Sequence, residues 1–231
     1  MEWSDDAIVL STRRHGESSA IVTLMTRDHG RHAGLVHGGK RAIVQPGNRV
    51  HAHWRARLAE HLGTYRCELT HAFAATLMDD AARLSGLSAA CAMVEATMPE
   101  RQPHEAVFDG LEAFLSALGG ETWLSAYVKW ELELLRELGF GLDLSQCAAT
   151  GGNDRLVYVS PKSGRAVSAS AGEPYKDKLL ALPGFLLPGG GAGGADEVAD
   201  GFRLTGYFLE RHVLDGGLPA ARRRLGARLF A

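Results

Sequence analysis

The pattern of apolar and polar positions changes once along this chain, near residue 72. Before that point, short segments with β-branched residues and period-two alternation predict strands. The clearest is 49–58, in which Arg49, His51, His53, Arg55 and Arg57 share one face and apolar residues occupy the other. The predicted strands cover residues 7–12, 19–26, 31–37, 49–58 and 64–71. Five short strands in about 70 residues suit a small barrel, and the oligonucleotide-binding (OB) barrel is the commonest nucleic-acid version.

Beyond residue 72 the spacing of apolar residues becomes helical. The pattern predicts helices over 78–84, 88–97, 103–118, 122–138, 197–214 and 219–230. In 122–138 the aromatic and leucine residues recur every three or four positions, which is typical of a core-facing stripe. Residues 156–159 and 165–167 predict a small hairpin, and the glycines of 188–194 predict a flexible linker.

These elements predict an α+β chain with several parts. We expect an OB-type barrel in residues 1–72, a helical domain in 73–144 and 195–231, a small hairpin in 145–185 and a Gly-rich linker in 186–194.

Charge divides the chain at the same place as the periodicity. Residues 1–71 carry ten Lys or Arg, whereas residues 72–150 carry four basic and twelve acidic side chains. A basic strand module joined to an acidic helical module is typical of a protein that holds nucleic acid with one part and proteins with another. Eight of the ten histidines lie in the first part, so its positive charge should grow as the pH falls toward about 6.5. A solvated surface without a partner is the alternative.

Composition also bounds the location of the protein. We find no run of about 18 apolar residues, so we expect no membrane span. The acidic start, 1–6, lacks a hydrophobic signal core, which argues against export. Cys67, Cys91 and Cys147 are odd in number and widely spaced, so they predict no disulfide framework and favour the reducing cytoplasm.

Motifs for catalysis are missing from the sequence. It has no phosphate loop, dinucleotide fingerprint, nucleophile elbow or H-E-x-x-H helix, and we therefore expect no enzyme and no cofactor. His51 and His53 have the spacing of a pair of metal ligands on a strand. They share their face with arginines that would repel a cation, which favours a solvated or phosphate-facing role.

The segment after residue 144 has the spacing of a degenerate zinc knuckle. Positions 147, 150, 168 and 171 follow a C-x2-C, hairpin, C-x2-C pattern, but only Cys147 is a cysteine. One thiolate cannot hold a structural zinc, so we expect no metal. Packing should hold the hairpin together instead, through Leu156, Tyr158, Val167 and Tyr175.

Several motifs, taken in order, resemble the RecO family of DNA repair proteins. Gly30-Arg31, Leu35-Val36 and Gly38-Gly39-Lys40-Arg41 are similar to the family's third strand and basic loop, and 7–10 with 16–19 to its first hairpin. The stretch 131–144 with Cys147 resembles the helix that leads into the family's knuckle, and Ser160-Pro161 with Gly164 resembles the knuckle's turn. His37 stands where the family usually has Lys, and the missing cysteines indicate a zinc-free member.

The resemblance implies a recombination mediator without catalytic chemistry. Family members bind single- and double-stranded DNA and anneal complementary strands. They contact the acidic C-terminal tail of the single-stranded-DNA-binding protein and join RecR to help load RecA. By this resemblance the protein acts in the cytoplasm, associated with the nucleoid.

Electrostatics then predicts which residues hold DNA. Cations of the barrel can neutralise phosphates whatever the sequence, and an exposed aromatic ring can stack on a base. The candidates are Arg31, Lys40, Arg41, Arg49, Arg55, Arg57 and, for stacking, Tyr65. Arg222, Arg223 and Arg224 (with Arg228) either extend this path or cap a helix C-terminus.

A second candidate site lies on helix 122–138. Lys129 precedes the pair Trp130-Glu131 at a position where the family has a basic residue, so we hypothesise that Lys129 with Trp130 receives the acidic tail. Two alternative functions remain open. The barrel is a protein-interaction adaptor that touches no DNA, or it serves an RNA-binding factor, because phosphate contacts hardly distinguish RNA from DNA.

Overall fold

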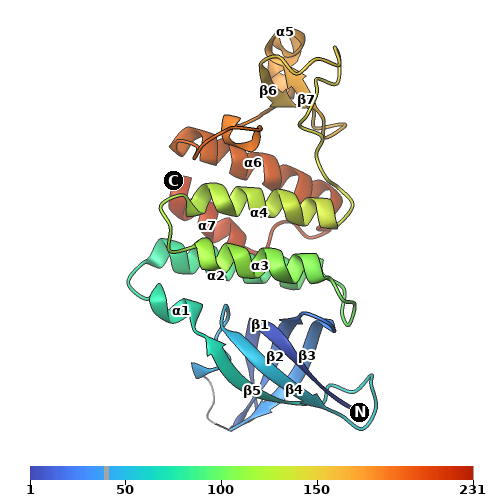
Figure 1. Cartoon of the computed structure of the whole chain (residues 1–231), viewed down its shortest axis with the longest axis vertical. Helices are drawn as coiled ribbons and strands as arrows, with labels where there is room; N and C mark the ends of the chain where they lie inside the picture. The colour runs from blue at the N-terminus through green and yellow to red at the C-terminus, as the bar shows by residue number, and fades with distance from the viewer. Residues whose placement is uncertain (39–41, 231) are drawn as a thin grey trace. The chain divides into compact units, whose positions relative to one another are not determined.

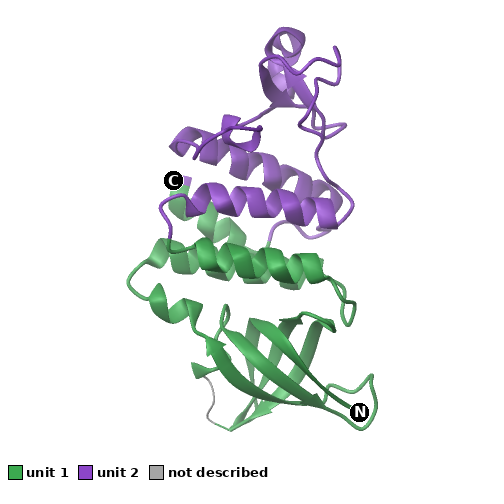
Figure 2. Cartoon of the chain, in the orientation of Figure 1, with its two compact units in different colours: residues 1–119, 219–229, 231 green, residues 120–218, 230 purple. Residues whose placement is uncertain are grey.

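The computed structural model describes residues 1–38 and 42–230, and it divides into two compact units. The first unit is Met1–Gly119 with Pro219–Leu229, and the second is Gly120–Leu218 with Phe230 (Figure 2). The helices that the sequence groups into one domain are therefore shared between the two units.

Five strands of the first unit close into a barrel with the order β1-β2-β3-β5-β4 (Figure 1). They are β1 (Glu2–His15), β2 (Ser19–Thr26), β3 (Gly30–His37), β4 (Arg49–Arg55) and β5 (Thr64–His71). Neighbouring strands are antiparallel except β3 and β5, which are parallel. The predicted five-stranded barrel in an α+β chain is confirmed.

The barrel closes where β3 meets β5. Leu35 lies opposite Thr64, and the Leu35 N–H donates a hydrogen bond of 3.0 Å to the Gly63 carbonyl. Gly63 has φ +64°, and a Cβ at this position would lie 2.4 Å from Nε1 of Trp54. Only glycine combines this backbone conformation with such a close approach. The Trp54 Nε1–H itself donates to the Leu62 carbonyl at 3.0 Å, so one turn fixes both the indole and the closure.

Strand β1 is longer than the pattern predicts, because it pairs with two neighbours. Glu2–Ile8 pairs with β4 and Ala7–His15 pairs with β2, and the pairing with β2 is irregular between Val9 and Ser11. The acidic residues at its start hide the strand in the sequence. One of them, Asp5, points inward and is only 5% exposed.

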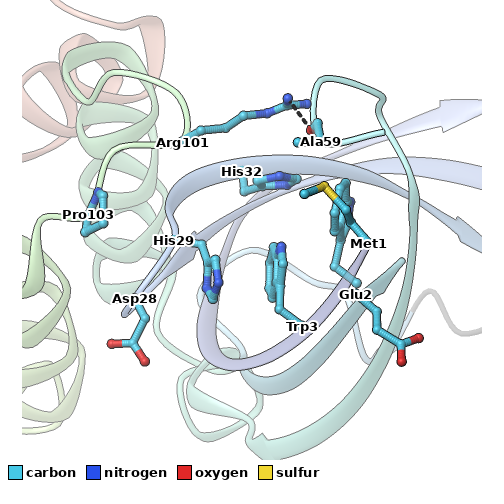
Figure 3. Close-up of a pocket in the computed structure, with 10 residues that line it drawn as sticks. Met1, Glu2, Trp3, Asp28, His29, His32, Ala59, Arg101 and Pro103 are labelled. Carbon is cyan, nitrogen blue, oxygen red and sulfur yellow. Dashed lines mark hydrogen bonds between the residues drawn. The ribbon is translucent and has the colours of Figure 1, made fainter. Parts of the chain in front are cut away.

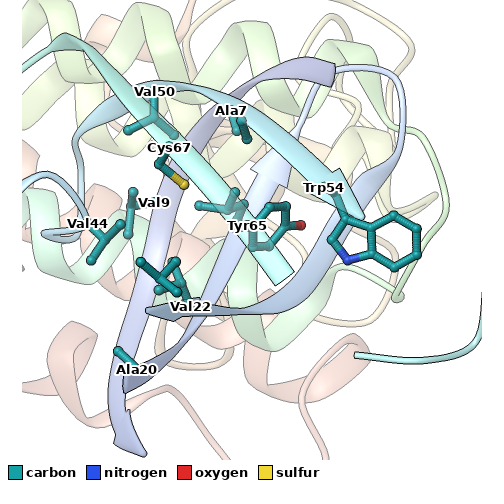
Figure 4. Close-up of a cluster of buried hydrophobic side chains, with 12 residues drawn as sticks. Ala7, Val9, Ala20, Val22, Val44, Val50, Trp54, Tyr65 and Cys67 are labelled. Atoms are coloured by element: carbon teal, nitrogen blue, oxygen red, sulfur yellow. The ribbon is translucent and has the colours of Figure 1, made fainter. Parts of the chain in front are cut away.

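Apolar residues from all five strands fill the barrel (Figure 4). Strand β4 alternates as predicted, with Val50 and Trp54 buried and Arg55 exposed. It ends at Arg55 instead of residue 58, because the pairing with β5 ends there. The core residues are Ala7, Val9, Ala20, Val22, Leu24, Val36, Val44, Val50, Ala52, Trp54, Tyr65 and Cys67.

Helices α1 (Phe73–Thr76), α2 (Ala81–Thr97) and α3 (Glu105–Ala117) follow the barrel, and α7 (Ala220–Phe230) belongs to the same unit except for its last residue. Helix α2 packs against β1. The sequence predicts two helices here, but the structure has one. The Asp80 carboxylate accepts the N–H groups of Ala82 and Arg83 at 3.0 Å, which starts the helix at residue 81 and not at 78.

In the second unit, α4 (Trp123–Glu137) packs against α6 (Ala195–His212). Tyr127 and Phe202 stack with ring centroids 5.2 Å apart. Gly201 permits the approach, because a Cβ there would lie 2.8 Å from Val128. The aromatic stripe predicted on the helix over 122–138 is indeed core.

The same unit holds a sheet with the order β7-β6-β8. Strands β6 (Leu156–Val159) and β7 (Ala166–Ser168) form the predicted hairpin, and β8 (Leu180–Ala181) is too short for the pattern to reveal. Helix α5 (Ala169–Gly172) and the 3-10 turns η2 (Glu173–Lys178) and η3 (Gly184–Leu186) complete it. Leu156 and Val167 are buried, but Tyr175 is 61% exposed, so the expected packing through Tyr175 is wrong.

The glycines predicted as a linker have a packing role. A Cβ on Gly193 would lie 2.3 Å from the Phe185 ring, and one on Gly190 would lie 2.2 Å from the Gly184 carbonyl oxygen. The segment therefore follows the surface of the second unit closely, which only glycines permit.

One buried polar pair in the barrel makes stability depend on pH. The Tyr65 hydroxyl lies 2.9 Å from Nδ1 of His32, and burial lowers the pKa of His32 to about 4, with the Arg101 charge adding to the effect. An unfolded histidine has a pKa of about 6.5. Neutral His32 thus contributes stability that is complete above pH 6.5 and is lost as the pH falls toward 4.

We expect His32 to remove about 2 kcal/mol from the free energy of unfolding between pH 7.5 and 5.0. Urea denaturation of the wild type and of His32→Gln at both pH values measures this contribution, because the variant lacks it. An equal loss of stability in both proteins would contradict the assignment.

Candidate nucleic-acid interface

Cationic side chains gather on the outer face of β4 and β5. His53 lies opposite Arg66 and Arg55 opposite Thr64, so these four side chains share one side of the sheet. They line a depression of about 250 Å3. A second one, of about 310 Å3, continues along the strands between His51, His53, Arg66 and Glu68. We call His53, Arg55 and Arg66 the β4–β5 cationic face.

Arg66 is missing from the residues predicted on sequence. Its position follows from the alternation in β5, where Tyr65 and Cys67 are buried and Arg66 and Glu68 are exposed. The alternation of buried and exposed positions in the sequence was therefore enough to place Arg66 on the outer face.

Pairing with carboxylates distinguishes the arginines of the barrel. Arg49 contacts Asp6 at 2.9 Å and Glu112 at 2.8 Å, and the Arg31 guanidinium donates to the Met98 carbonyl at 2.7 Å and lies 3.4 Å from Glu100. Arg55 and Arg66, by contrast, form no ion pair within the described residues. Arg31 and Arg49 already have compensated charge, and the β4–β5 cationic face holds the uncompensated charge of these strands.

Other predicted DNA-binding residues lie in different surroundings. Arg57 is exposed in the loop that follows β4. Lys40 and Arg41 lie outside the described residues. Three further basic residues, Arg13, Arg14 and His15, are exposed at the end of β1. Sequence reasoning missed them because the predicted strand ended at residue 12.

Tyr65 corrects an expectation. It is only 4% exposed and belongs to the barrel core, where its ring packs edge-on against Trp3 and its hydroxyl meets His32. A buried ring cannot stack on a base, so the expectation that Tyr65 is an exposed platform is wrong. The period-two pattern gave two faces of β5, and barrel closure turned the Tyr65 face inward.

The arginines of α7 also differ in their exposure to solvent. Arg222 is 3% exposed, which contradicts its predicted place on a DNA path, whereas Arg223 and Arg224 are exposed. On α4, Trp130 is 7% exposed and is part of the core, so it offers no surface to a partner. Lys129 is exposed, and its Nζ lies 5.8 Å from the centroid of the Phe185 ring.

Comparison with known proteins identifies the family to which the chain belongs. A family model described as "Recombination protein O N terminal" matches residues 1–73, and one described as "Recombination protein O C terminal" matches residues 78–221. The chain belongs to the RecO family. The DNA repair protein RecO of Rhodospirillum centenum is 58% identical over 97% of this chain and 93% of its own length. Those of Rhodospirillum rubrum and Rhizobium etli (strain CFN 42) are 51% and 50% identical over 99% and 98% of this chain, and cover 96% and 91% of their own lengths.

Membership of the RecO family gives the chain a role in DNA repair and recombination, and its N-terminal barrel is of the OB type. No helix among the described residues is long and apolar enough to cross a membrane.

Three of the four knuckle positions of this RecO chain, 147, 150 and 168, lie together, although only the first is a cysteine. The Ser168 N–H donates to the Cys147 Sγ at 3.3 Å, and the Ser168 Oγ lies 3.5 Å from the same sulfur. Hydrogen bonds from the Ser168 and Thr150 hydroxyls lower the pKa of the Cys147 thiol to about 6. One sulfur and two hydroxyl groups do not make a zinc site. Within residues 1–38 and 42–230, no group of three or more His, Cys, Asp or Glu side chains is placed to hold a metal ion.

Because three of the four positions lie together, cysteines at all four should create a metal site. We expect the triple variant Thr150→Cys, Ser168→Cys and Ala171→Cys to bind one Zn²⁺ tetrahedrally through four sulfurs, at Zn–S distances of about 2.3 Å. Titration with Co²⁺ and its thiolate absorption would detect the site. The wild type is the control, and a triple variant without that absorption would show that the spacing is coincidental.

Proposed function

We propose that this chain is a non-catalytic DNA-binding mediator of recombination that grips DNA with the β4–β5 cationic face. The observation that carries the proposal is the selective pairing of the barrel arginines. Arg31 and Arg49 are compensated by carboxylates, whereas Arg55 and Arg66 are exposed and lie diagonally on one face of β4 and β5, with His53 opposite Arg66.

Phosphate is the ligand that fits this face. Guanidinium groups pair with phosphate oxygens and release counterions, an attraction that depends on the charge of the backbone and not on base sequence. Such a face accepts single- and double-stranded DNA alike. It also supports annealing, which requires only that two strands be held close, with their repulsion screened, while the bases remain free to pair.

Membership of the RecO family supports our proposal for the partners. The mediator joins RecR and helps it load RecA on DNA coated by the single-stranded-DNA-binding protein, in a cytoplasmic, nucleoid-associated setting. No residue of the β4–β5 cationic face needs to exchange protons or electrons for these tasks, so the proposal includes no active site.

The salt dependence of binding tests the DNA grip. We expect the log of the affinity for single-stranded DNA to fall with log salt, with a slope of about 0.7 for each neutralised phosphate. The double variant Arg55→Ala/Arg66→Ala should lose affinity and reduce this slope by about 1.4. Fluorescence anisotropy of a labelled strand across a salt series gives both quantities.

Arg136→Ala/Arg203→Ala is the matched control, because both side chains are exposed but lie in the second unit. A wild-type slope in Arg55→Ala/Arg66→Ala would remove these residues from the interface. If the wild type bound no DNA at low salt, the adaptor function would replace the proposal. Tighter binding of RNA than of DNA at equal salt would favour the RNA-binding alternative.

We further propose that Lys129 receives the C-terminal tail of the single-stranded-DNA-binding protein. Its ammonium group is exposed, and it lies 5.8 Å from the centroid of the Phe185 ring, which is itself buried. The surface therefore offers a cation to a partner. The terminal carboxylate of this acidic tail has the complementary charge. Trp130 is excluded from this role by its burial.

Reversal of the Lys129 charge should weaken tail binding about ten-fold or more, because a like charge would then face the peptide carboxylate. Anisotropy of a labelled tail peptide with Lys129→Glu measures the loss. Lys162→Glu is the control, since Lys162 is exposed on the β6–β7 turn of the same unit. Equal affinities for Lys129→Glu and the wild type would refute the assignment.

A further inference from the structure

A pocket of about 460 Å3 opens at one end of the barrel (Figure 3). The start of β1, the β2–β3 turn, the loop after β4 and the connection between α2 and α3 form its walls, all within the first unit. Its volume is in the range of small-molecule sites, and its lining is mostly apolar.

Aromatic rings form the floor of the pocket as a preassembled column. The His29 ring stacks on Trp3 at 4.1 Å with an angle of 8° between the planes, and Trp3 stacks on Trp54 at 5.5 Å and 21°. His32 stands edge-on to Trp3 and Trp54. Trp54 and His32 are buried, but Trp3 and His29 are only half-buried, so the column presents ring surface to the pocket. A flat aromatic ligand is the shape that such a column accepts.

Hydrogen bonds hold both sides of the pocket in place. The buried Asp5 carboxylate accepts the Asp28 N–H at 2.8 Å and contacts the His29 Nδ1 at 2.9 Å. On the opposite wall, the Arg101 guanidinium donates to the carbonyls of three successive residues, 59–61, at 2.6 to 3.1 Å. The pocket is thus formed before any ligand arrives, which lowers the entropy lost on binding.

The charges of the rim restrict the ligand further. The acidic residues Glu2 and Asp28 stand at the rim of the pocket, and the Arg101 donors are already used by the loop carbonyls (Figure 3). A phosphate inside would be repelled, whereas the amino group of a base can donate to a carboxylate. Phosphates have a place next to the pocket, because the pocket residue Glu2 lies on β1 directly opposite Arg55 of the β4–β5 cationic face. No ion pair joins Glu2 to Arg55 among the described residues.

We propose that this pocket takes one unpaired nucleobase of a DNA strand whose phosphates lie on the β4–β5 cationic face. The inference rests on the proposed DNA grip and adds a reason to prefer single strands. A base in a duplex is paired and stacked, and it must leave the helix before it can enter a pocket. The cationic face binds either form of DNA, and the pocket increases the affinity for the single strand.

An apolar side chain of a protein partner is the competing occupant. Met1 lines the pocket and is 72% exposed, and Leu58 is 47% exposed in the adjoining loop. The preassembled rings and the neighbouring Arg55 favour the base over this partner, and the experiment below separates the two.

The test compares three labelled DNAs with the full chain at matched salt. They are an oligodeoxycytidine strand, a strand of equal length with abasic residues at its central positions, and a duplex. We expect the intact strand to bind about ten-fold more tightly than the abasic strand, which has the same phosphates but no bases to insert. Equal affinity for the two strands would overturn the inference while leaving the DNA grip intact. Failure to bind any of the three would overturn both.

A variant that fills the pocket from its exposed rim completes the test. Ala59→Trp adds a ring at an exposed position and leaves the barrel core unchanged, and Ala113→Trp on the exposed side of α3 is the matched control. Ala59→Trp should remove the preference for the intact strand without changing the affinity for the abasic strand or the duplex. If Ala59→Trp keeps the preference, the pocket does not hold the base and the protein partner becomes its occupant.

Discussion

Closure of the five-stranded sheet is the constraint on which the rest of the first unit depends. The parallel contact of β3 with β5 at Leu35 and Thr64 gives every strand an inside and an outside. Apolar side chains fill the inside, so the cations of β4 and β5 are confined to the outer surface. Closure also pairs the first residues of β1 with the end of β4, which places the aromatic pocket next to Arg55. One geometric condition thus joins a surface for phosphate to a pocket for a ring.

The part of the barrel that suits DNA is the part whose arginines have no carboxylate partner, and the number of arginines matters less. Arg27, Arg31 and Arg49 form ion pairs with acidic residues between positions 100 and 112. The segment around α3 therefore compensates the charge of these three arginines. Such partly exposed pairs add little stability, about 0–1 kcal/mol each, but they remove charge from that side of the barrel. Uncompensated cations remain at the other end of β4, on β5 and at the end of β1.

The sequence predicted features that depend on local periodicity. The two faces of β4, the helices over 103–118 and 122–138 and the hairpin at 156–167 follow from spacing alone, and they were confirmed. Features that depend on a residue far away in the sequence could not be predicted from local spacing. The start of β1 looks like an acidic tail until β4 lies beside it, and Tyr65 and Arg222 are buried only because other elements cover them. The pairs Arg31–Glu100 and Arg49–Glu112 join residues more than 60 positions apart, so the chain pattern gave no sign of them. Arg66, in contrast, was predictable from the alternation of β5.

The measurement that tests this account most directly is a contact map of the protein on single-stranded DNA. Photo-cross-linking of the full chain to a thymidine-rich strand, followed by peptide mass spectrometry, identifies the residues that touch DNA. The account predicts cross-links in peptides that contain β4, β5 and the first residues of β1. Cross-links confined to residues 120–218, with none on the barrel, would contradict the claim that the barrel's outer face holds the DNA.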